Sequence, residues 1–371
     1  MARGEEGGER GLFTPYRVRG VTLRNRIVVS PMCQYSSEDG FASDWHLVHL
    51  GSRAVGGSSL VFAEATAVLA EGRISPFDLG LWKDEQVAPL KRVTEFVAAQ
   101  GAVPGIQLGH AGRKASTAPP WVGGKAVGPE AGGWRPIYAP SAIPYRAGGV
   151  IPEALDAGGI ERVIEGFGAA ARRALAAGFQ VLEVHSAHGY LLHEFLSPLS
   201  NRREDGWGGS FEGRTRLTLE VVREVRRHWP AHLPLFVRLS ATDWVEGGWS
   251  PEDTVRLSRL LASAEVDLVD CSSGGLIPDA VIPSGPGYQV PFAAEVRRAA
   301  GIATGAVGLI TDPRHADQIV RSQQADLVIM ARELLRHPYW PLWAARTLDQ
   351  AGPWPDQYLR ARLNPTGASP A

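Results

Sequence analysis

Residues 179–190 read Phe-Gln-Val-Leu-Glu-Val-His-Ser-Ala-His-Gly-Tyr. The first half, Phe179 to Val184, is a short and mostly apolar run, typical of a parallel strand that is buried on both faces. The second half places two imidazoles and one phenol directly after that run. The stretch therefore predicts a buried strand with a polar cluster at its end, and similar runs recur along the chain.

Short apolar runs of this type alternate with helical patterns over most of the chain. The predicted strands are Ile27–Val29, Leu60–Ala63, Val103–Leu108, Phe179–Val184, Leu235–Leu239, Leu268–Asp270, Ala303–Val307 and Leu327–Met330. Helix starts are indicated at Ser250-Pro251 and Asp312-Pro313, where a capping residue precedes a proline. Eight such alternations predict an α/β fold, a single (β/α)8 TIM barrel. A doubly wound open sheet has the same periodicity and stays open as the alternative.

A long insertion lies between the third predicted strand and its helix, at about residues 110–157. A connection of that length inside a compact domain is normally functional. We expect it to act as a lid over the site, with Trp121 and Trp134 as candidate lid side chains. The predicted organisation is a flexible N-terminal tail over residues 1–11, the barrel over 12–350, and a C-terminal segment over 351–371.

Composition narrows the class of protein. The chain has 371 residues, 44% of them hydrophobic and 21% charged, and a formal net charge of −1. These are values of an ordinary globular protein, and the near-zero charge gives no support to a nucleic-acid or membrane partner. Two cysteines exclude a disulfide scaffold and a cysteine-rich zinc or iron–sulfur module. With no signal peptide visible and no apolar run of about 18 residues, we expect a cytoplasmic protein.

His185, His188 and Tyr190 form the most reactive cluster in the sequence, because the active site of a barrel lies at the C-terminal ends of its strands. In an enzyme, the imidazoles would donate hydrogen bonds to an oxygen that gains negative charge, and the phenol would supply a proton. In a metal site, the two histidines would bind zinc together with His193 or Glu194. The third interpretation is a structural loop with satisfied histidines.

Other strand ends carry residues with both a functional and a structural interpretation. Arg238 lies in an apolar run, where a buried arginine needs either an internal ion pair or an anionic ligand. Cys33 is either a small buried hydrophobe or a thiol placed against a cofactor. Gly308 and Arg332 follow the last two strands, whose loops and a short extra helix often build a phosphate site in barrels. A turn glycine and a surface arginine are the alternatives there.

Taken together and in this order, these motifs resemble the Old Yellow Enzyme family of FMN-dependent ene reductases over about residues 12–360. The resemblance is carried by Ser30-Pro31-Met32-Cys33, Glu64-Ala65-Thr66, Gln107, His110-Ala111-Gly112-Arg113-Lys114, His185 to Tyr190, His193 to Arg202 and Arg332 to Arg336. Cys33 resembles the thermophilic-like bacterial branch, which has Cys where the yeast-type branch has Thr. The chain departs from the family at Ala331, where Gly is usual, and in its longer insertion.

The resemblance implies roles for individual residues. The residues implied to bind FMN are Ser30, Pro31, Met32, Cys33, Ala65, Gln107, Arg238, Gly308, Ala331 and Arg332. Those implied to bind substrate are Tyr35, His185, His188 and Arg360. Tyr190 is the implied proton donor. Because Arg360 resembles an arginine that reaches the neighbouring subunit's site, a homodimer or a homotetramer built as a dimer of dimers is implied.

The implied activity is that of an FMN-dependent NAD(P)H oxidoreductase, with no metal. NADPH or NADH reduces FMN, hydride passes from FMN N5 to Cβ of an α,β-unsaturated carbonyl, imide or nitro compound, and Tyr190 protonates Cα. A metal-dependent barrel hydrolase is one rival, but the strand ends offer mainly Ser, Gln, Arg and Gly as further ligands. A non-catalytic flavin-binding protein is the other, and the His-x-x-His-x-Tyr cluster argues against it.

Overall fold

The computed structural model describes residues 10–362, and its centre is a closed barrel of eight parallel strands. In chain order the barrel strands are β3 (Ile27–Val29), β4 (Leu60–Ala67), β5 (Val103–Gly109), β8 (Val181–Ser186), β9 (Leu235–Ser240), β10 (Leu268–Ser272), β11 (Ala303–Ala306) and β12 (Leu327–Met330). The last strand pairs with the first, so the barrel has no free edge. The predicted (β/α)8 fold is confirmed, and the open doubly wound sheet is excluded.

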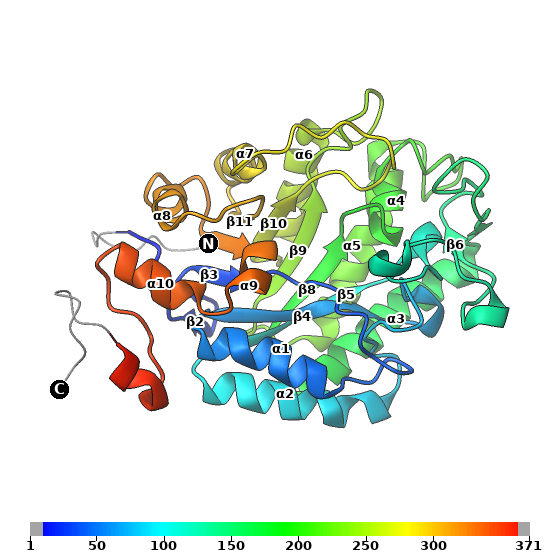
Figure 1. The fold of residues 1–371 in the computed structure, drawn as a ribbon. Coiled ribbons are helices and arrows are strands. Elements are labelled where there is room, and N and C mark those ends of the chain that lie inside the picture. The colour runs from blue at the N-terminus through cyan, green and yellow to red at the C-terminus, as the bar shows by residue number, and fades with distance from the viewer. Residues whose placement is uncertain (1–9, 363–371) are drawn as a thin grey trace.

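Helices surround the barrel, as Figure 1 shows for α1, α2, α3 and α5. The helices are α1 (Asp44–Val55), α2 (Val87–Ala99), α3 (Ala157–Ala176), α4 (Leu191–Leu196), α5 (Phe211–His228), α6 (Pro251–Ser263), α7 (Val290–Ala300), α8 (Pro313–Arg321), α9 (Arg332–Arg336) and α10 (Trp340–Thr347). The predicted caps are present, since the Ser250 side chain accepts from Asp253 N and the Asp312 side chain accepts from His315 N.

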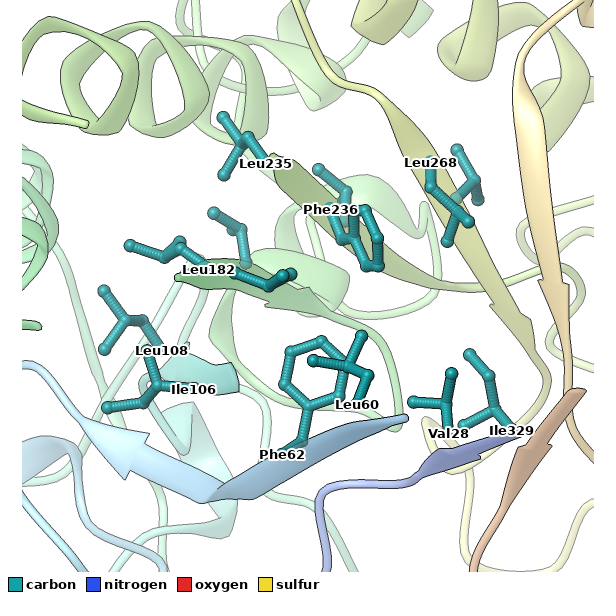
Figure 2. Packing of buried hydrophobic residues seen from close by; sticks show 14 of the residues in the cluster. Val28, Leu60, Phe62, Ile106, Leu108, Leu182, Leu235, Phe236, Leu268 and Ile329 are labelled. Atoms are coloured by element: carbon teal, nitrogen blue, oxygen red, sulfur yellow. The ribbon is translucent and has the colours of Figure 1, made fainter. Parts of the chain in front are cut away.

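The barrel interior is filled by apolar side chains from facing strands, and Figure 2 shows Leu60, Phe62, Leu182 and Phe236 among them. The rings of Phe62 and Phe236 lie 6.2 Å apart between centroids. Gly105 of β5 makes room for this packing, because a Cβ at that position would lie 2.7 Å from the Phe62 ring. The interior at this level is therefore packed core, so ligands have to bind beyond the strand ends.

Five of the predicted strands end too early, three of them by two residues or more. The structure continues β4 to Ala67, β8 to Ser186 and β10 to Ser272. The apolar run stops where side chains begin to face the polar mouth of the barrel, but backbone pairing continues, as in the pairing of His185 with Arg238. Glu64 to Thr66, His185, Ser186, Cys271 and Ser272 thus lie within strands, which holds their side chains more rigidly than a loop would.

The insertion over residues 110–157 has local structure of its own. It contains the short 3₁₀ turns η3 (Gly112–Lys114), η4 (Pro120–Val122) and η5 (Pro129–Ala131), and a parallel pair of strands, β6 (Tyr138–Ala139) and β7 (Glu153–Ala154). At the N-terminal side of the chain, β1 (Tyr16–Val18) and β2 (Val21–Leu23) form an antiparallel pair.

Both predicted terminal segments lie partly outside the described residues. Of the predicted tail over 1–11, residues 1–9 lie outside, as do residues 363–371 of the C-terminal segment. Leu12, the first residue of the predicted barrel unit, is fully buried. Within residues 10–362, no helix has the length and apolar character needed to cross a membrane.

Candidate active site

His185, His188 and Tyr190 come together at the C-terminal end of β8, as the sequence predicts. The ring centroids of His185 and His188 are 5.1 Å apart, and those of His185 and Tyr190 are 5.0 Å apart. Both pairs meet edge to face, at interplanar angles of 84° and 82°. His185 is buried on the strand, whereas His188 and Tyr190 are half-buried on the turn that follows it. The cluster thus has one side open to a ligand.

His188 is held at each of its polar atoms. Its backbone N donates to Ser240 Oγ (2.9 Å) and its carbonyl accepts from Lys114 Nζ (2.8 Å). In the ring, Nε2 lies 2.7 Å from Ser272 Oγ and Nδ1 lies 3.4 Å from His185 Nε2. His188 has a φ of +59°, in the left-handed region that non-glycine residues rarely occupy. Such a conformation persists only where its surroundings determine it, as these four contacts do.

His193 has a different role from the one a zinc site would require. Its Nδ1 accepts from Gly189 N (2.9 Å), and its Nε2 lies 3.0 Å from Asp243 Oδ1. Asp243 in turn accepts from the Ser197 hydroxyl (2.6 Å). Both ring nitrogens of His193 are therefore engaged in holding the turn between His188 and Tyr190. Within residues 10–362, no group of three or more His, Cys, Asp or Glu side chains is arranged to hold a metal ion.

The protonation states of the cluster suit hydrogen-bond donation and proton transfer. Burial, reinforced by the charge of Arg238, holds the pKa of His185 and of His188 well below the usual value, so both imidazoles are neutral at pH 7. Burial raises the pKa of Tyr190 well above that of a free phenol, so the hydroxyl keeps its proton. His185 Nδ1 is buried and has no hydrogen-bond partner within the described chain. The cluster can therefore orient an oxygen and supply a proton.

Arg238 has the internal ion pair that was one of its two predicted explanations. Its Nε lies 3.1 Å from Asp270 Oδ2 on the adjacent strand β10, and its Nη1 donates to Ser30 Oγ (3.0 Å). On the other side, the Gln107 amide donates to Glu183 Oε1 (2.8 Å), and burial raises the pKa of Glu183. A guanidinium on β9 and an amide on β5 are thus held in place by neighbouring side chains, and groups of this kind suit the polar edge of a flavin ring.

The residues implied to bind FMN fit that group on two further observations. Ser30 is buried, but residues 31–36 after it are all half-buried, so an uncovered strip of chain lies at the mouth. At the ends of β11 and β12, Gly308 is buried with a φ of +128°, and the Arg332 guanidinium is exposed with no hydrogen bond or ion pair inside residues 10–362. Ala331 has a φ of −107°, so the glycine usual in the family is not required by a left-handed backbone.

The other predicted site residues lie in different surroundings from one another. Tyr35 meets the insertion directly, because its ring lies 5.4 Å from the ring of Trp121. Burial raises the pKa of the Cys33 thiol, so the thiol is neutral. Arg360 is exposed in η6 (Asp356–Ala361) and has no contact with the cluster in its own chain. In Figure 1 this red segment lies below α10, on the opposite side of the picture from β6 and α4.

Several residues of the site were missed in the sequence. Asp78 lines a small pocket together with His110, His185 and Tyr190, and burial raises its pKa to about 7. Ser240 and Ser272 are the last residues of β9 and β10, which sequence reading could have found by extending each apolar run by one or two residues. Lys114 ends the motif His110-Ala111-Gly112-Arg113-Lys114, but nothing in the sequence indicates its contact with His188.

Comparison with known proteins adds independent findings. Residues 11–350 match the model of the NADH:flavin oxidoreductase / NADH oxidase family. An NADPH dehydrogenase of Listeria innocua serovar 6a is 49% identical over 352 residues, which is 94% of this chain and 98% of that protein. An NADPH dehydrogenase of Geobacillus sp. is 50% identical over 339 residues, covering 91% and 94% of the two chains. Among solved structures, morphinone reductase superposes with a TM-score of 0.76 at 27% identity, covering 94% of this chain and 92% of its own.

Proposed function

The chain belongs to the NADH:flavin oxidoreductase / NADH oxidase family, and from that premise we propose that it reduces the activated C=C bond of α,β-unsaturated carbonyl, imide or nitro compounds. It is an oxidoreductase of the Old Yellow Enzyme type that uses FMN and NAD(P)H, like the NADPH dehydrogenases it is similar to. What we propose beyond this is the class of alkene that the enzyme reduces and the residues that act on it.

One observation carries the proposal: two neutral imidazoles and a protonated phenol meet in one half-buried cluster. Reduction of a polarised alkene needs hydrogen-bond donors at the activating group and an acid at Cα. A hydrolase would instead need a nucleophile or a metal-bound water. The His185, His188 and Tyr190 side chains supply the first set.

We assign the cofactor to the uncovered strip and the strand ends beside it. The FMN-binding residues of the proposal are Ser30, Pro31, Met32, Cys33, Ala65, Gln107, Arg238, Gly308, Ala331 and Arg332. Bound there, FMN supplies the hydride that NADPH or NADH has provided. The Arg238 charge favours a negatively charged ligand at its end of the site, and Arg332 gives a phosphate a guanidinium partner.

On the substrate side, His185 and His188 orient and polarise the activating oxygen, which replaces the long 3.4 Å contact between their two rings. The Tyr190 O–H bond breaks as the new Cα–H bond forms. Tyr35 lines the pocket, and its contact with Trp121 supports a lid role for the insertion. The exposure of Arg360 supports its reaching the site of a neighbouring subunit in a homodimer or homotetramer.

The test is a pair of half-reactions followed by flavin absorbance. Under anaerobic conditions, NADPH should bleach the purified holoenzyme, and 2-cyclohexen-1-one should restore the colour in step with formation of cyclohexanone. Bleaching that cyclohexenone, maleimide and nitrostyrene all fail to reverse would reject alkene reduction. A protein that NADPH and NADH cannot bleach would point to flavin binding without catalysis.

A further inference from the structure

We propose that Lys114 is a positioning residue for alkene reduction, whose ammonium fixes the turn that carries His188 and seats the ring of Tyr190. The inference rests on the function proposed above and adds a residue to it. It follows from where Lys114 Nζ lies among the loops at the barrel mouth, and from the charge that it brings there.

Lys114 joins two loops that are already in close backbone contact. Its Nζ donates to the carbonyls of His188 (2.8 Å) and Gly275 (3.1 Å), which belong to the loops after β8 and β10. A Cβ at Gly189 would lie 2.3 Å from the Gly275 carbonyl oxygen, and a Cβ at Gly275 would lie 2.7 Å from His188 Cα. The two backbones therefore touch, and one ammonium satisfies a carbonyl from each.

The same ammonium lies against the proposed proton donor. Lys114 Nζ is 5.0 Å from the centroid of the Tyr190 ring and 4.8 Å from that of Tyr145, a residue of the insertion. Both distances fit cation–π contacts. Since Tyr190 becomes more negative as its proton leaves, a cation beside its ring stabilises that change. Lys114 thus acts on His188 through the backbone and on Tyr190 through the ring.

The charged groups around Lys114 come from three elements. Arg113 precedes it in η3, Glu194 faces it from α4, and Arg146 lies in the insertion. Burial is the main cause that lowers the pKa of Lys114 to about 8; Glu194 opposes this shift, and the two arginines add to it. Burial also raises the pKa of Glu194 to about 8. The imidazoles of His185 and His188 are neutral here, and the pKa of Tyr190 and of Tyr145 is raised, so these groups do not titrate near pH 8.

The sign of the pH effect follows from these charges. Lys114 is an ammonium below about pH 8 and loses its charge as the pH rises through that value. Reoxidation of the reduced holoenzyme by cyclohexenone should therefore slow as the pH rises through about 8. Reduction by NADPH needs no proton from Tyr190, so it should not share that fall.

The experiment compares the holoenzyme with Lys114→Met and Lys114→Arg in both half-reactions between pH 6 and 10. Lys114→Met should slow reoxidation by about 10²-fold, the cost of a small misplacement of catalytic groups, and slow flavin reduction much less. Lys114→Arg should retain most of the rate and lose the fall near pH 8, because a guanidinium stays charged. Lys125→Met, an exposed lysine of the same insertion, is the matched control and should behave as the parent.

Separate outcomes reject the inference and the proposed function. Reoxidation of Lys114→Met at the parent rate overturns the inference, and so does a Lys114→Arg variant that keeps the fall near pH 8. Glu194→Gln should keep the fall in the reoxidation rate near pH 8. If this variant loses the fall, Glu194 is the group that titrates, and the assignment to Lys114 is overturned. If Lys114→Met fails to fold, the Lys114→Arg pH profile still decides. If the parent holoenzyme itself is not reoxidised by cyclohexenone, the proposed function fails instead.

Discussion

The two ends of the site differ in how their polar groups are paired. At the end built by β8, β9 and β10, polar groups of the protein contact one another, whereas at the end built by β11 and β12 the Arg332 guanidinium has no partner among the described residues. His188 is contacted at four polar atoms by Ser240, Lys114, Ser272 and His185. Arg332, by contrast, makes no hydrogen bond or ion pair inside residues 10–362. The first end is held together by contacts within the chain, and the second presents an exposed guanidinium that is free to pair with a ligand.

This difference predicts two kinds of mutational effect, one for the end that holds His188 and one for the end that holds Arg332. Changes at the histidine end should affect the folded protein and the chemistry, even without cofactor. Changes at the arginine end should affect only the binding of a negatively charged group. Four substitutions test that separation.

The largest effect is expected for Tyr190→Phe. The change removes the proposed proton donor but keeps the ring that packs on His185. Reoxidation by cyclohexenone should slow by about 10²- to 10⁴-fold, the usual contribution of a general acid. Reduction of the flavin by NADPH should change little, as stopped-flow absorbance can measure. Equal slowing of both half-reactions would remove Tyr190 as the proton donor.

Arg332→Ala should weaken FMN binding by about 10- to 100-fold, since a hydrogen bond to a charged group contributes about 1.5–3 kcal/mol. The thermal midpoint of the apoprotein should not move, because Arg332 has no partner to lose. Fluorescence titration of apoprotein with FMN measures the first quantity, and calorimetry the second. Arg336→Ala, which removes an exposed partner of Glu333, is the control for FMN affinity. A destabilised Arg332→Ala apoprotein would contradict the comparison.

His188→Ala should lower the free energy of unfolding of the apoprotein by about 1–3 kcal/mol. It removes the ring contact of His185 Nε2 and one of the two partners of Ser272 Oγ, and it places alanine at a φ of +59°. Urea unfolding measures the loss. His188→Asn should lose less, because asparagine tolerates the left-handed region. Equal losses in the two variants would mean that the backbone conformation contributes little.

The smallest effect is expected for Trp121→Ala. Trp121 is 69% exposed, and its ring meets Tyr35 edge to face. Loss of one aromatic pair is equivalent to about 0.5–1.5 kcal/mol, so KM for cyclohexenone should rise about 2- to 10-fold with the apoprotein stability unchanged. Trp134 offers the contrast, since its indole donates to the Glu71 carbonyl and packs on Arg73. Trp134→Ala should lower the stability of the apoprotein. If it changes only KM for cyclohexenone, Trp134 acts as a lid residue instead.

The sequence determined the local structure and the class of chemistry. Apolar runs fixed the barrel strands to within a few residues, and the Ser250 and Asp312 caps fixed helix starts, because backbone propensities and capping act between neighbours in the chain. His185, His188 and Tyr190 could be grouped because they are five residues apart at most and follow one strand. The family resemblance then followed from the order of such motifs.

Only the tertiary structure decided which strand ends meet. Strand registers place Asp270 beside Arg238 and Ser272 level with Ser240, and the packing of the loop after β5 against the loops after β8 and β10 brings Lys114 to His188. The insertion likewise reaches Tyr35 through Trp121, while Arg360 stays apart from the site in its own chain. These contacts join residues 32 to 86 positions apart, and no local pattern encodes them. They depend on the order, register and closure of the barrel, which set every side chain at its mouth at once.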